Sequence, residues 1–293
     1  MRLSIVIAAW NGSTSLRRCL ISLVNQLDPE DSEVIVASNF SSDGVQDLLQ
    51  SVSFLHFISL PSVSTVPELR TRGIERASGD VIALLEDHCT VDEAWAAQMR
   101  KAHKLSYSVI GGSVENVRGA SPLNWAVYFY DYGPYMLPDV PRVAKSLTGC
   151  NISYKTRVLH EVRDRYRNGF HETFINQELQ RRGYELYLLP SAMAYHNKKY
   201  RLKSSIGESY HHGRLFGALR VSDASFNERA YRVATSLFLP VLLPSRIVLR
   251  TFRKKNHVKE LVIAFPYLLL LIGAWSYGEF CGYVRRERRN PRK

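Results

Sequence analysis

Short apolar runs alternate with longer segments of helical spacing along the first hundred residues. Four continuous apolar runs have the length of buried strands: 4–9, 33–37, 56–60 and 81–85. Three other segments carry apolar residues three or four positions apart, as amphipathic helices do: 16–27, 67–77 and 92–103. Strands that alternate with helices predict an α/β domain whose mainly parallel sheet is covered by helices on both faces.

Polar or aromatic residues follow three of the predicted strands. They are Trp10-Asn11, Ser38-Asn39 and Glu86-Asp87-His88. Ligands bind beyond the carboxyl ends of the strands in such sheets, so we expect a nucleotide pocket there. Neither G-x-G-x-x-G nor G-x-x-x-x-G-K-[ST] follows the first strand, which disfavours a nicotinamide-dependent dehydrogenase and a P-loop NTPase. The plain alternative is that these residues are polar strand ends facing water.

Composition narrows the class of protein, and the distribution of charge changes the picture further. The 293-residue chain is 45% hydrophobic, which excludes a disordered or collagen-like protein. Its 4 cysteines are scattered and form no C-x-x-C pair, which disfavours a disulfide scaffold or a cysteine-based zinc site and fits a reducing compartment. The whole net charge of +12 falls in residues 201–293, which contain 18 Lys or Arg and 6 Asp or Glu. This asymmetry predicts an anionic surface as a partner.

The basic last third also contains the longest uncharged stretches. Residues 233–245 are uncharged but include two prolines, and residues 261–278 are uncharged for a length marginal for a membrane span, which needs about 20 residues. Basic clusters lie at 250–259 and 285–293. Because basic flanks stay on the cytoplasmic side and adsorb to anionic lipid, we predict a monotopic or peripheral attachment rather than a crossing. A soluble helical pair, buried against the domain or another subunit, is the alternative.

Sequence segments in the first two-thirds of the chain resemble family-2 glycosyltransferases with the GT-A fold. Three segments resemble the nucleotide-sugar-binding half of that family: IVIAAWNGSTSLRRCLISLVNQL, EVIVASNFSSDG and LRTRGIERASGDVIALLEDHCTVDEAW. Two further segments resemble the family's acceptor half: LTGCNISYKTRVLHEV and GFHETFINQELQRRGYELYLLPSAMAYH. The resemblance covers residues 3–196 and implies a donor half at 1–104 and an acceptor half at 105–200. The charge and the apolar stretches described above add a membrane-attachment region at 201–293.

The resemblance also implies a divalent metal site. Glu86 and His88 occupy the two positions of the family's Asp-x-Asp signature, with Asp87 as an alternative ligand or a ribose contact. His196 matches a histidine of the family and is a further metal ligand or a diphosphate contact, against a purely structural role. Since imidazole suits Mn²⁺ better than Mg²⁺, we expect manganese.

Donor contacts are implied at the strand ends and on one helix. Ser38 and Asn39 stand where the family has an acidic pair, and the Asn39 amide can hydrogen-bond a base edge. Arg70 matches an arginine beside the nucleotide, and its fork suits phosphate; the alternative is a solvated helix face. With Trp10 and Asn11 at the end of the first strand, these residues imply a nucleotide-sugar donor, with a UDP-sugar expected.

An inverting transfer needs a general base on the acceptor side. Counting back from Gly183 along the family's frame places Glu172 at the catalytic carboxylate and His171 beside it. The alternative for Glu172 is a simple first-turn helix acid, and Glu178 fits the frame less well. Arg214, in the basic segment Tyr210–Arg214, is expected to contact an anionic acceptor or leaving group.

Residues 125–135 are dense in aromatics and predict an acceptor-facing loop, or else a core strand followed by a turn.

These inferences predict an inverting, metal-dependent glycosyltransferase at the cytoplasmic face of the cell inner membrane. It would transfer a sugar to a lipid-linked or membrane-proximal acceptor and bind anionic lipids. A catalytically inactive nucleotide-sugar-binding or scaffold protein of the same fold is the first alternative, because His88 and Ser38-Asn39 replace acidic residues. A nucleic-acid-binding protein is favoured only by a pI of about 9.6, and no nucleic-acid partner is expected because the basic residues interleave with long apolar runs.

Overall fold

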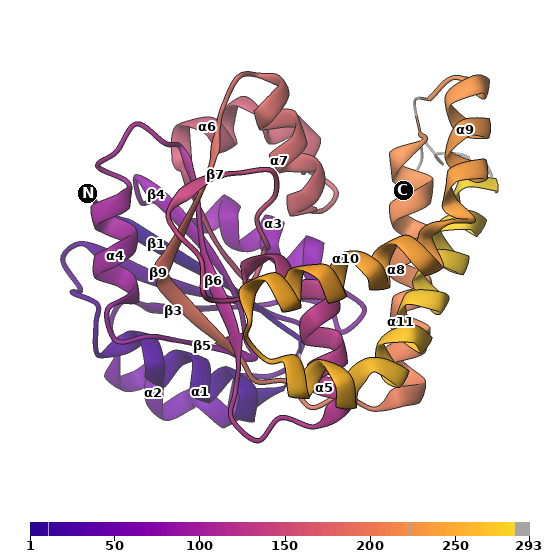
Figure 1. Cartoon of the computed structure of the whole chain (residues 1–293). Coiled ribbons are helices and arrows are strands. Elements are labelled where there is room, and N and C mark those ends of the chain that lie inside the picture. Colours follow the sequence, from indigo (N-terminus) through magenta and orange to yellow (C-terminus); the bar gives the residue numbers. More distant parts are fainter. Residues whose placement is uncertain (11, 223, 285–293) are drawn as a thin grey trace. The chain divides into compact units, whose positions relative to one another are not determined.

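The computed structural model describes residues 1–10, 12–222 and 224–284, which form two compact units (Figure 1). The first unit comprises Met1–Val117 and Tyr135–Lys198, and the second comprises Arg118–Pro134 and Lys199–Lys293. The expected boundary between a donor half and an acceptor half, at residue 104, lies inside the first unit. Asn11 and the basic cluster at 285–293 lie outside the described residues.

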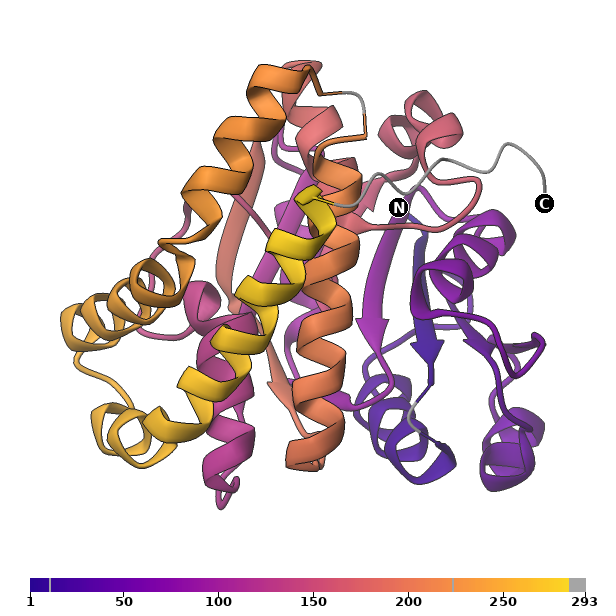
Figure 2. The ribbon, with the colours of Figure 1, turned by 90° about the vertical axis from the view of Figure 1, so that its right-hand side faces the viewer.

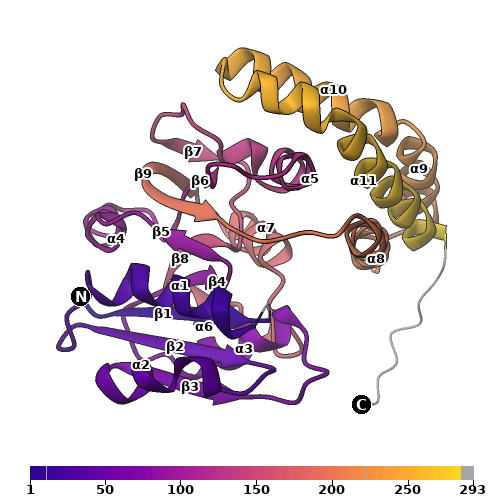
Figure 3. The same cartoon turned by 90° about the horizontal axis from the view of Figure 1, so that it is seen from below.

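One mixed sheet of 9 strands forms the centre of the first unit. The strands are β1 Leu3–Ala9, β2 Ser32–Ser38, β3 Leu55–Ser59, β4 Val81–Glu86, β5 Cys89–Val91, β6 Val109–Asn116, β7 Arg142–Ala144, β8 Asn151–Lys155 and β9 Leu186–His196. Their order is β3-β2-β1-β4-β8-β6-β9-β5, with β7 paired to β9, and Figure 3 shows the succession from β3 to β6.

The predicted parallel sheet is confirmed for its first part and is mixed beyond it. Strands β3, β2, β1 and β4 are all parallel, and β6 is parallel to β9. Strand β8 runs antiparallel to both β4 and β6, and β5 and β7 run antiparallel to β9. A strand that is antiparallel to both neighbours leaves those neighbours parallel to each other. The carboxyl ends of β1, β2, β4, β6 and β9 therefore share one edge of the sheet.

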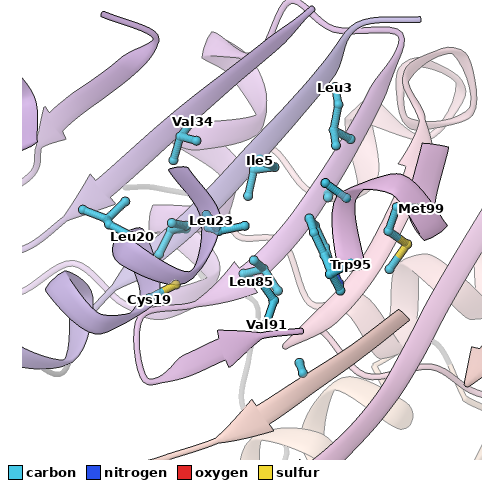
Figure 4. Packing of buried hydrophobic residues seen from close by; sticks show 14 of the residues in the cluster. Leu3, Ile5, Cys19, Leu20, Leu23, Val34, Leu85, Val91, Trp95 and Met99 are labelled. Atoms are coloured by element: carbon cyan, nitrogen blue, oxygen red, sulfur yellow. The ribbon is translucent and has the colours of Figure 1, made fainter. Parts of the chain in front are cut away.

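Helices cover this sheet on both faces, as the alternation of patterns predicts. In the first unit they are α1 Ser13–Val24, α2 Gln46–Ser51, α3 Val66–Arg76, α4 Trp95–Ala102, α6 Thr156–Glu161 and α7 Glu172–Arg181. On one face, α1 and α4 bury Leu20, Leu23, Trp95 and Met99 in one cluster with Leu3 and its neighbours on the strands (Figure 4). This apolar layer supplies the main driving force for folding of the unit.

Helix α3 packs against the opposite face and positions the site described below. It begins with a capping box, in which Thr65 and Glu68 satisfy each other's free backbone N–H groups. Pro67 stands in its first turn, where a missing N–H costs nothing. A Cβ at Gly73 would overlap the Val6 side chain, so the glycine lets the helix approach β1 closely. The predicted helix over 67–77 is confirmed.

The second unit is helical throughout the elements that the structure describes. It contains α5 Pro122–Val127, a π-helical turn Tyr128–Tyr132, α8 Leu202–Arg220, α9 Phe226–Ser236, α10 Leu239–Lys254 and α11 Val258–Val284. Helices α8 and α11 lie side by side (Figure 2). Glycines on both make this close approach possible: a Cβ at Gly213 would overlap the Trp275 carbonyl, and one at Gly278 would overlap the Tyr210 carbonyl.

The aromatic segment 125–135 is helical, so the prediction of a loop or a strand is wrong. Ser121 accepts a hydrogen bond from the backbone N–H of Asn124, and Pro122 follows it in the first turn. These are strong helix-start signals that outweigh the β-propensity of the aromatics. Tyr128 and Phe129 are fully buried and add packing that keeps the segment helical.

Candidate active site

The ends of β1 and β4 are joined through Asp87. Its carboxylate accepts a hydrogen bond of 2.8 Å from the backbone N–H of Trp10, and it is completely buried. The Trp10 side chain remains largely in solvent, since the residue is 46% exposed. Asp87 therefore holds the edge of the sheet together and leaves an aromatic face accessible beside it.

Ser38 and Asn39 shape the next strand end. The Ser38 hydroxyl donates to the Phe40 carbonyl and accepts from the Phe40 backbone N–H, so it is engaged in a local turn. The Asn39 amide nitrogen donates to the carbonyls of Ser62 and Ser64, at 3.3 Å each. Among the described residues, the Asn39 side-chain oxygen accepts no hydrogen bond, so it is the atom of this pair suited to receive one from a ligand.

Arg70 joins two of the predicted site carboxylates, Glu86 and Glu172. We call these three residues the Arg70 triad. The Arg70 Nη1 donates to Glu172 Oε2 at 2.6 Å, and Nη2 donates to Glu86 Oε1 at 2.7 Å. The arginine is 5% exposed, so the alternative of a solvated helix face is wrong. The two carboxylate side chains are 19% and 25% exposed, and each is bound to a different arm of one guanidinium.

Helix α3 and the start of α7 are held together, and this brings the triad into contact. The Thr71 hydroxyl donates to the Tyr166 carbonyl at 2.9 Å, and the Phe170 backbone N–H donates to the Pro67 carbonyl at 2.9 Å. A Cβ at Gly149 would lie 2.7 Å from the Arg70 Nη2 and 2.9 Å from the Glu172 carboxyl carbon, so any other residue there would displace the ends of these two side chains.

The electrostatics of the triad favour ionised groups. Burial alone would lower the pKa of Arg70, but the charges of Glu172 and Glu86 outweigh it and raise that pKa. Burial alone would raise the pKa of Glu172, but the Arg70 charge and a hydrogen bond from the backbone N–H of Glu172 itself lower it below the usual value for glutamate. Glu172 is therefore a carboxylate at neutral pH, the form that a general base requires.

His88 and His196 lie next to the triad. Their rings meet edge to face with centroids 4.9 Å apart. His196 is the last residue of β9 and is fully buried; burial first, and then His88 and Lys198, lower its pKa well below the usual value for histidine. It is therefore neutral at physiological pH, which is the form in which imidazole binds a metal.

The pair of Glu86 and His88 has the chemistry and spacing for a divalent cation. Glu86 Oε2 lies 3.2 Å from His88 Nε2. Two donors that bind one cation at about 2.1 Å and a right angle stand about 3 Å apart, so the pair fits two adjacent ligand positions. Within the described part of the chain, no group of three or more His, Cys, Asp or Glu side chains is arranged to hold a metal ion. A cation bound here would take its remaining ligands from water and donor phosphates.

The other two expected substrate contacts, His171 and Arg214, are not members of the Arg70 triad, although His171 helps to lower the pKa of the adjacent Glu172. His171 precedes α7 as its N-terminal cap residue, and its carbonyl accepts the first backbone hydrogen bonds of that helix. Arg214 belongs to α8 in the second unit and is partly buried. Sequence reasoning missed that Arg70 bridges the two carboxylates, and it missed Gly149, whose neighbour pattern TGCN gives no local signal of a close contact.

The comparisons with known proteins agree on one family. A family model described as glycosyl transferase family 2 matches residues 4–163. Glycosyltransferase AglE of Haloferax volcanii is 25% identical over 118 residues, which are 38% of this chain and 39% of that protein. The uncharacterized glycosyltransferase YfnE of Bacillus subtilis is 30% identical over 107 residues, 36% of this chain and 27% of that protein. The chain thus spans well under half the length of either relative.

Solved structures share the fold. The Pyrobaculum calidifontis mannosyltransferase PcManGT, in complex with GDP-Man and Mn²⁺, has a TM-score of 0.59 at 11% identity, covering 95% of this chain and 86% of that chain. S. aureus TarS (residues 1–349) with UDP-GlcNAc has a TM-score of 0.56 at 17% identity, covering 94% and 81%. At such low identity these likenesses establish the fold, and the expected GT-A architecture is confirmed.

Proposed function

Because the chain belongs to glycosyl transferase family 2, we propose that it transfers one sugar, with inversion, from a nucleoside-diphosphate sugar to a lipid-linked or membrane-proximal acceptor. A UDP-sugar is the donor we expect. The attacking group is a hydroxyl or phosphate oxygen of the acceptor. The matched relatives are considerably longer than the matched segments, so donor, acceptor and attachment are proposals for this chain.

The Arg70 triad is the observation that carries this proposal. It puts Glu172, ionised and partly buried beside a guanidinium, next to the strand end where a diphosphate would lie. Glu172 accepts the proton of the acceptor hydroxyl while the oxygen attacks the anomeric carbon. The bond from that carbon to the diphosphate oxygen breaks, and the diphosphate leaves with the electron pair. Arg70 keeps the carboxylate aimed and ionised during the attack.

Binding of the donor uses the polar strand ends. The Asn39 oxygen accepts a hydrogen bond from the base, and the exposed Trp10 ring lies against the nucleoside. Glu86 and His88 would hold a Mn²⁺ ion, with His196 as a further ligand or a diphosphate contact. When bound, the cation neutralises charge on the departing diphosphate.

Donor binding and turnover test the proposed function directly. The full chain in detergent should be stabilised by a sugar nucleotide with Mn²⁺, by about 2.7 kcal/mol at a hundredfold excess over the dissociation constant. Slow release of nucleoside diphosphate should depend on Mn²⁺ and stop with EDTA. Glu86→Gln should raise the Mn²⁺ requirement more than about tenfold, because a ligand is lost. The exposed Glu93→Gln serves as the matched control.

Two other outcomes of this experiment would each contradict the proposal. Stabilisation by a sugar nucleotide without any release of diphosphate, with or without acceptor lipids, identifies the inactive binding protein. Absence of stabilisation by any of UDP-GlcNAc, UDP-glucose, UDP-galactose and GDP-mannose argues against a donor site.

The second unit carries an apolar surface beside basic residues, which supports attachment to an anionic membrane. Side chains more than half exposed on and between α9, α10 and α11 include Leu237, Phe238, Val241, Leu249, Phe252, Val262 and Ile263. Exposed basic residues on the same helices include Arg246, Arg253 and Lys259. Apolar area and positive charge together give lasting adsorption to a lipid surface.

The packing of α11 favours adsorption over crossing. Helix α11 is 27 residues long and contains an 18-residue stretch with a mean hydropathy of 1.8, so its length and composition allow a span. Helices α9 and α10 together form a second candidate, bent by 64°. Helix α11 packs most extensively against α8, which carries charged side chains along its length, from Lys203 to Arg220. The buried Glu279 of α11 accepts a hydrogen bond from Trp275 Nε1 and lies 3.7 Å from Arg220. A charged helix packed along α11 would be costly inside hydrocarbon.

Vesicle flotation tests this attachment. The full chain should float with vesicles containing anionic phosphatidylglycerol, in low salt and with excess DNA as a competitor, and not with neutral vesicles. Replacing Arg246 and Arg253 by glutamine should weaken binding by about 1 kcal/mol each, and salt should reduce the difference. Arg167→Gln with Arg181→Gln, in the first unit, is the control pair. Equal flotation with neutral lipid, or displacement by DNA, would be the contrary result.

A further inference from the structure

Asn116 is a buried polar side chain whose hydrogen-bonding groups are unsatisfied. The residue is 8% exposed, and neither its amide nitrogen nor its amide oxygen has a hydrogen-bond partner among the described residues. A buried amide without partners is costly, and nearly all buried polar groups in native proteins are paired. Nothing in the reaction described above uses this side chain. An unpaired donor and acceptor on one buried group point to a ligand that supplies both.

The topology puts Asn116 at the edge of the sheet where the donor is expected. It is the last residue of β6, as Glu86 is of β4 and His196 is of β9, and all three strands run in the same direction. Asn116 pairs in register with His196, so the two side chains project on the same face of the sheet. Asn116 is thereby next to the pair of His88 and His196.

The order of the strands gives a direction along this edge. From Asn39 after β2, two strand positions lead through β1 to Glu86, and two more lead through β8 to Asn116 (Figure 3). At about 4.8 Å per strand, each of these steps spans about 10 Å across the sheet. Strand β6 also extends further than β4 at this edge. Gly111 of β6 and Leu84 of β4 both pair with Ile152 of β8, so Glu86 at the end of β4 is level with Ser113 of β6. Asn116 therefore lies three residues further along the strand direction than Glu86, and two strand positions away from it across the sheet.

We propose that Asn116 forms a subsite for the transferred sugar of the donor, with its amide bound to sugar hydroxyl groups. This rests on the proposed function, since it takes the base to lie over β2 and the diphosphate at β4. The next moiety of a nucleoside-diphosphate sugar is the sugar itself, and it extends toward β6. A hydroxyl donates and accepts hydrogen bonds, and it therefore satisfies both the oxygen and the nitrogen of the amide.

The test compares two identical substitutions with opposite expected effects on stability. Asn116→Leu removes an unsatisfied amide from a buried position, so the melting temperature of the ligand-free full chain should stay the same or rise. Asn151→Leu is the matched control. Its side chain is also buried, but its oxygen accepts from Trp95 Nε1 and its nitrogen donates to the Ser113 and Ala192 carbonyls, at 2.9 Å each. This variant should melt well below the wild type.

Ligand-induced shifts in melting temperature then locate the contact. UDP and GDP are compared with UDP-GlcNAc, UDP-glucose, UDP-galactose and GDP-mannose, all with Mn²⁺. In the wild type, one sugar nucleotide should stabilise more than its nucleoside diphosphate. Asn116→Leu should keep the stabilisation by the nucleoside diphosphate and lose the additional stabilisation that the sugar provides. The KM for that sugar nucleotide should rise about three- to tenfold.

Each other result has a separate meaning. Wild-type protein that no nucleotide stabilises overturns the proposed function. Wild-type protein that nucleoside diphosphates stabilise but no sugar stabilises further overturns the subsite. The subsite is also excluded if Asn116→Leu keeps the full sugar-dependent stabilisation, or if it loses the stabilisation by UDP or GDP as well. A melting temperature as low as that of Asn151→Leu would indicate that Asn116 has a structural partner, and it would exclude the subsite too.

Discussion

Replacing Glu172 by glutamine is expected to lower kcat about a thousandfold, the loss typical when a general base is removed. Glutamine has nearly the same shape and still accepts a hydrogen bond from Arg70, so the site should remain assembled. It cannot take up the proton of the acceptor hydroxyl. Donor binding, measured by the shift in melting temperature, should change little, because the proposed role of Glu172 is on the acceptor side.

Glu178→Gln is the matched control for this variant. It makes the same chemical change on the same helix, six residues further along, where the carboxylate forms ion pairs with the exposed Arg181 and Arg182. Such pairs contribute little, so activity should stay within about twofold of the wild type. A large loss in Glu178→Gln and a small one in Glu172→Gln would show that the base is assigned to the wrong carboxylate.

Replacing Arg70 by methionine is expected to reduce both stability and activity. The variant removes the shared cation of two partly buried carboxylates, and breaking such an ion pair costs about 3–5 kcal/mol, with the lower end appropriate for side chains in contact with water. Glu86 and Glu172 would then repel each other. Urea unfolding measures the loss of stability, and initial rates measure the loss of activity. Arg72→Met, on the same helix with a 62% exposed side chain, is the control and should be close to neutral.

The pH dependence of activity distinguishes a role in the site from simple loss of structure. In the wild type, the pKa of Glu172 lies below its usual value, so the base stays ionised and kcat/KM persists into mildly acidic solution. Without the charge of Arg70, burial raises that pKa, and the acidic limb of the profile should move to higher pH. Arg70→Lys, which restores the charge without the fork, should move the limb part of the way back. An unchanged profile in Arg70→Met would contradict the electrostatic role.

The free energy of unfolding should also depend on pH through Glu172. The pKa of Glu172 is lower in the folded protein than in the unfolded chain, where it is about 4.3. Its contribution to the free energy of unfolding is therefore complete above that value and disappears as pH falls through the folded pKa. This part of the acid sensitivity should be absent in Arg70→Met, because the depressed pKa depends on the guanidinium.

Local signals account for the elements that were predicted well. Strands β1, β2 and β4 are continuous apolar runs that only a strand buried on both faces explains, and the structure has them within one or two residues of the prediction. Helix α7 begins at Glu172, where counting back from Gly183 put the start of a helix. Gly183 has a φ of 88°, a left-handed conformation that glycine adopts readily and that ends a helix. Gly183 therefore marks the end of α7 for a physical reason, and the start of the helix can be counted back from it.

Pairings distant in sequence were not predictable in this way. Whether a short strand such as β8 runs parallel or antiparallel to β4 depends on how the chain returns to the sheet, and no pattern within β8 records it. The aromatic segment at 125–135 was assigned by composition, whereas its conformation follows from the cap at Ser121 and the burial of Tyr128. Strand propensity is decided largely by what the side chains pack against.

The resemblance to the family, counted back from Gly183, implied that Glu172 stands at the start of a helix. By itself, the sequence determined the α/β architecture of the first unit and the identity of its strand-end residues. These depend on periodicity, turn residues and caps, whose physical effects extend over a few neighbouring residues. Only the tertiary structure decided that Arg70 bridges Glu86 and Glu172, which are 16 and 102 residues away along the chain. The same holds for Asn116, which the pairing of β6 with β9 leaves buried beside His196, with no hydrogen-bond partner for its amide in the part of the chain that the structure describes. Ion pairs and burial depend on distance in space, and the folded sheet sets that distance.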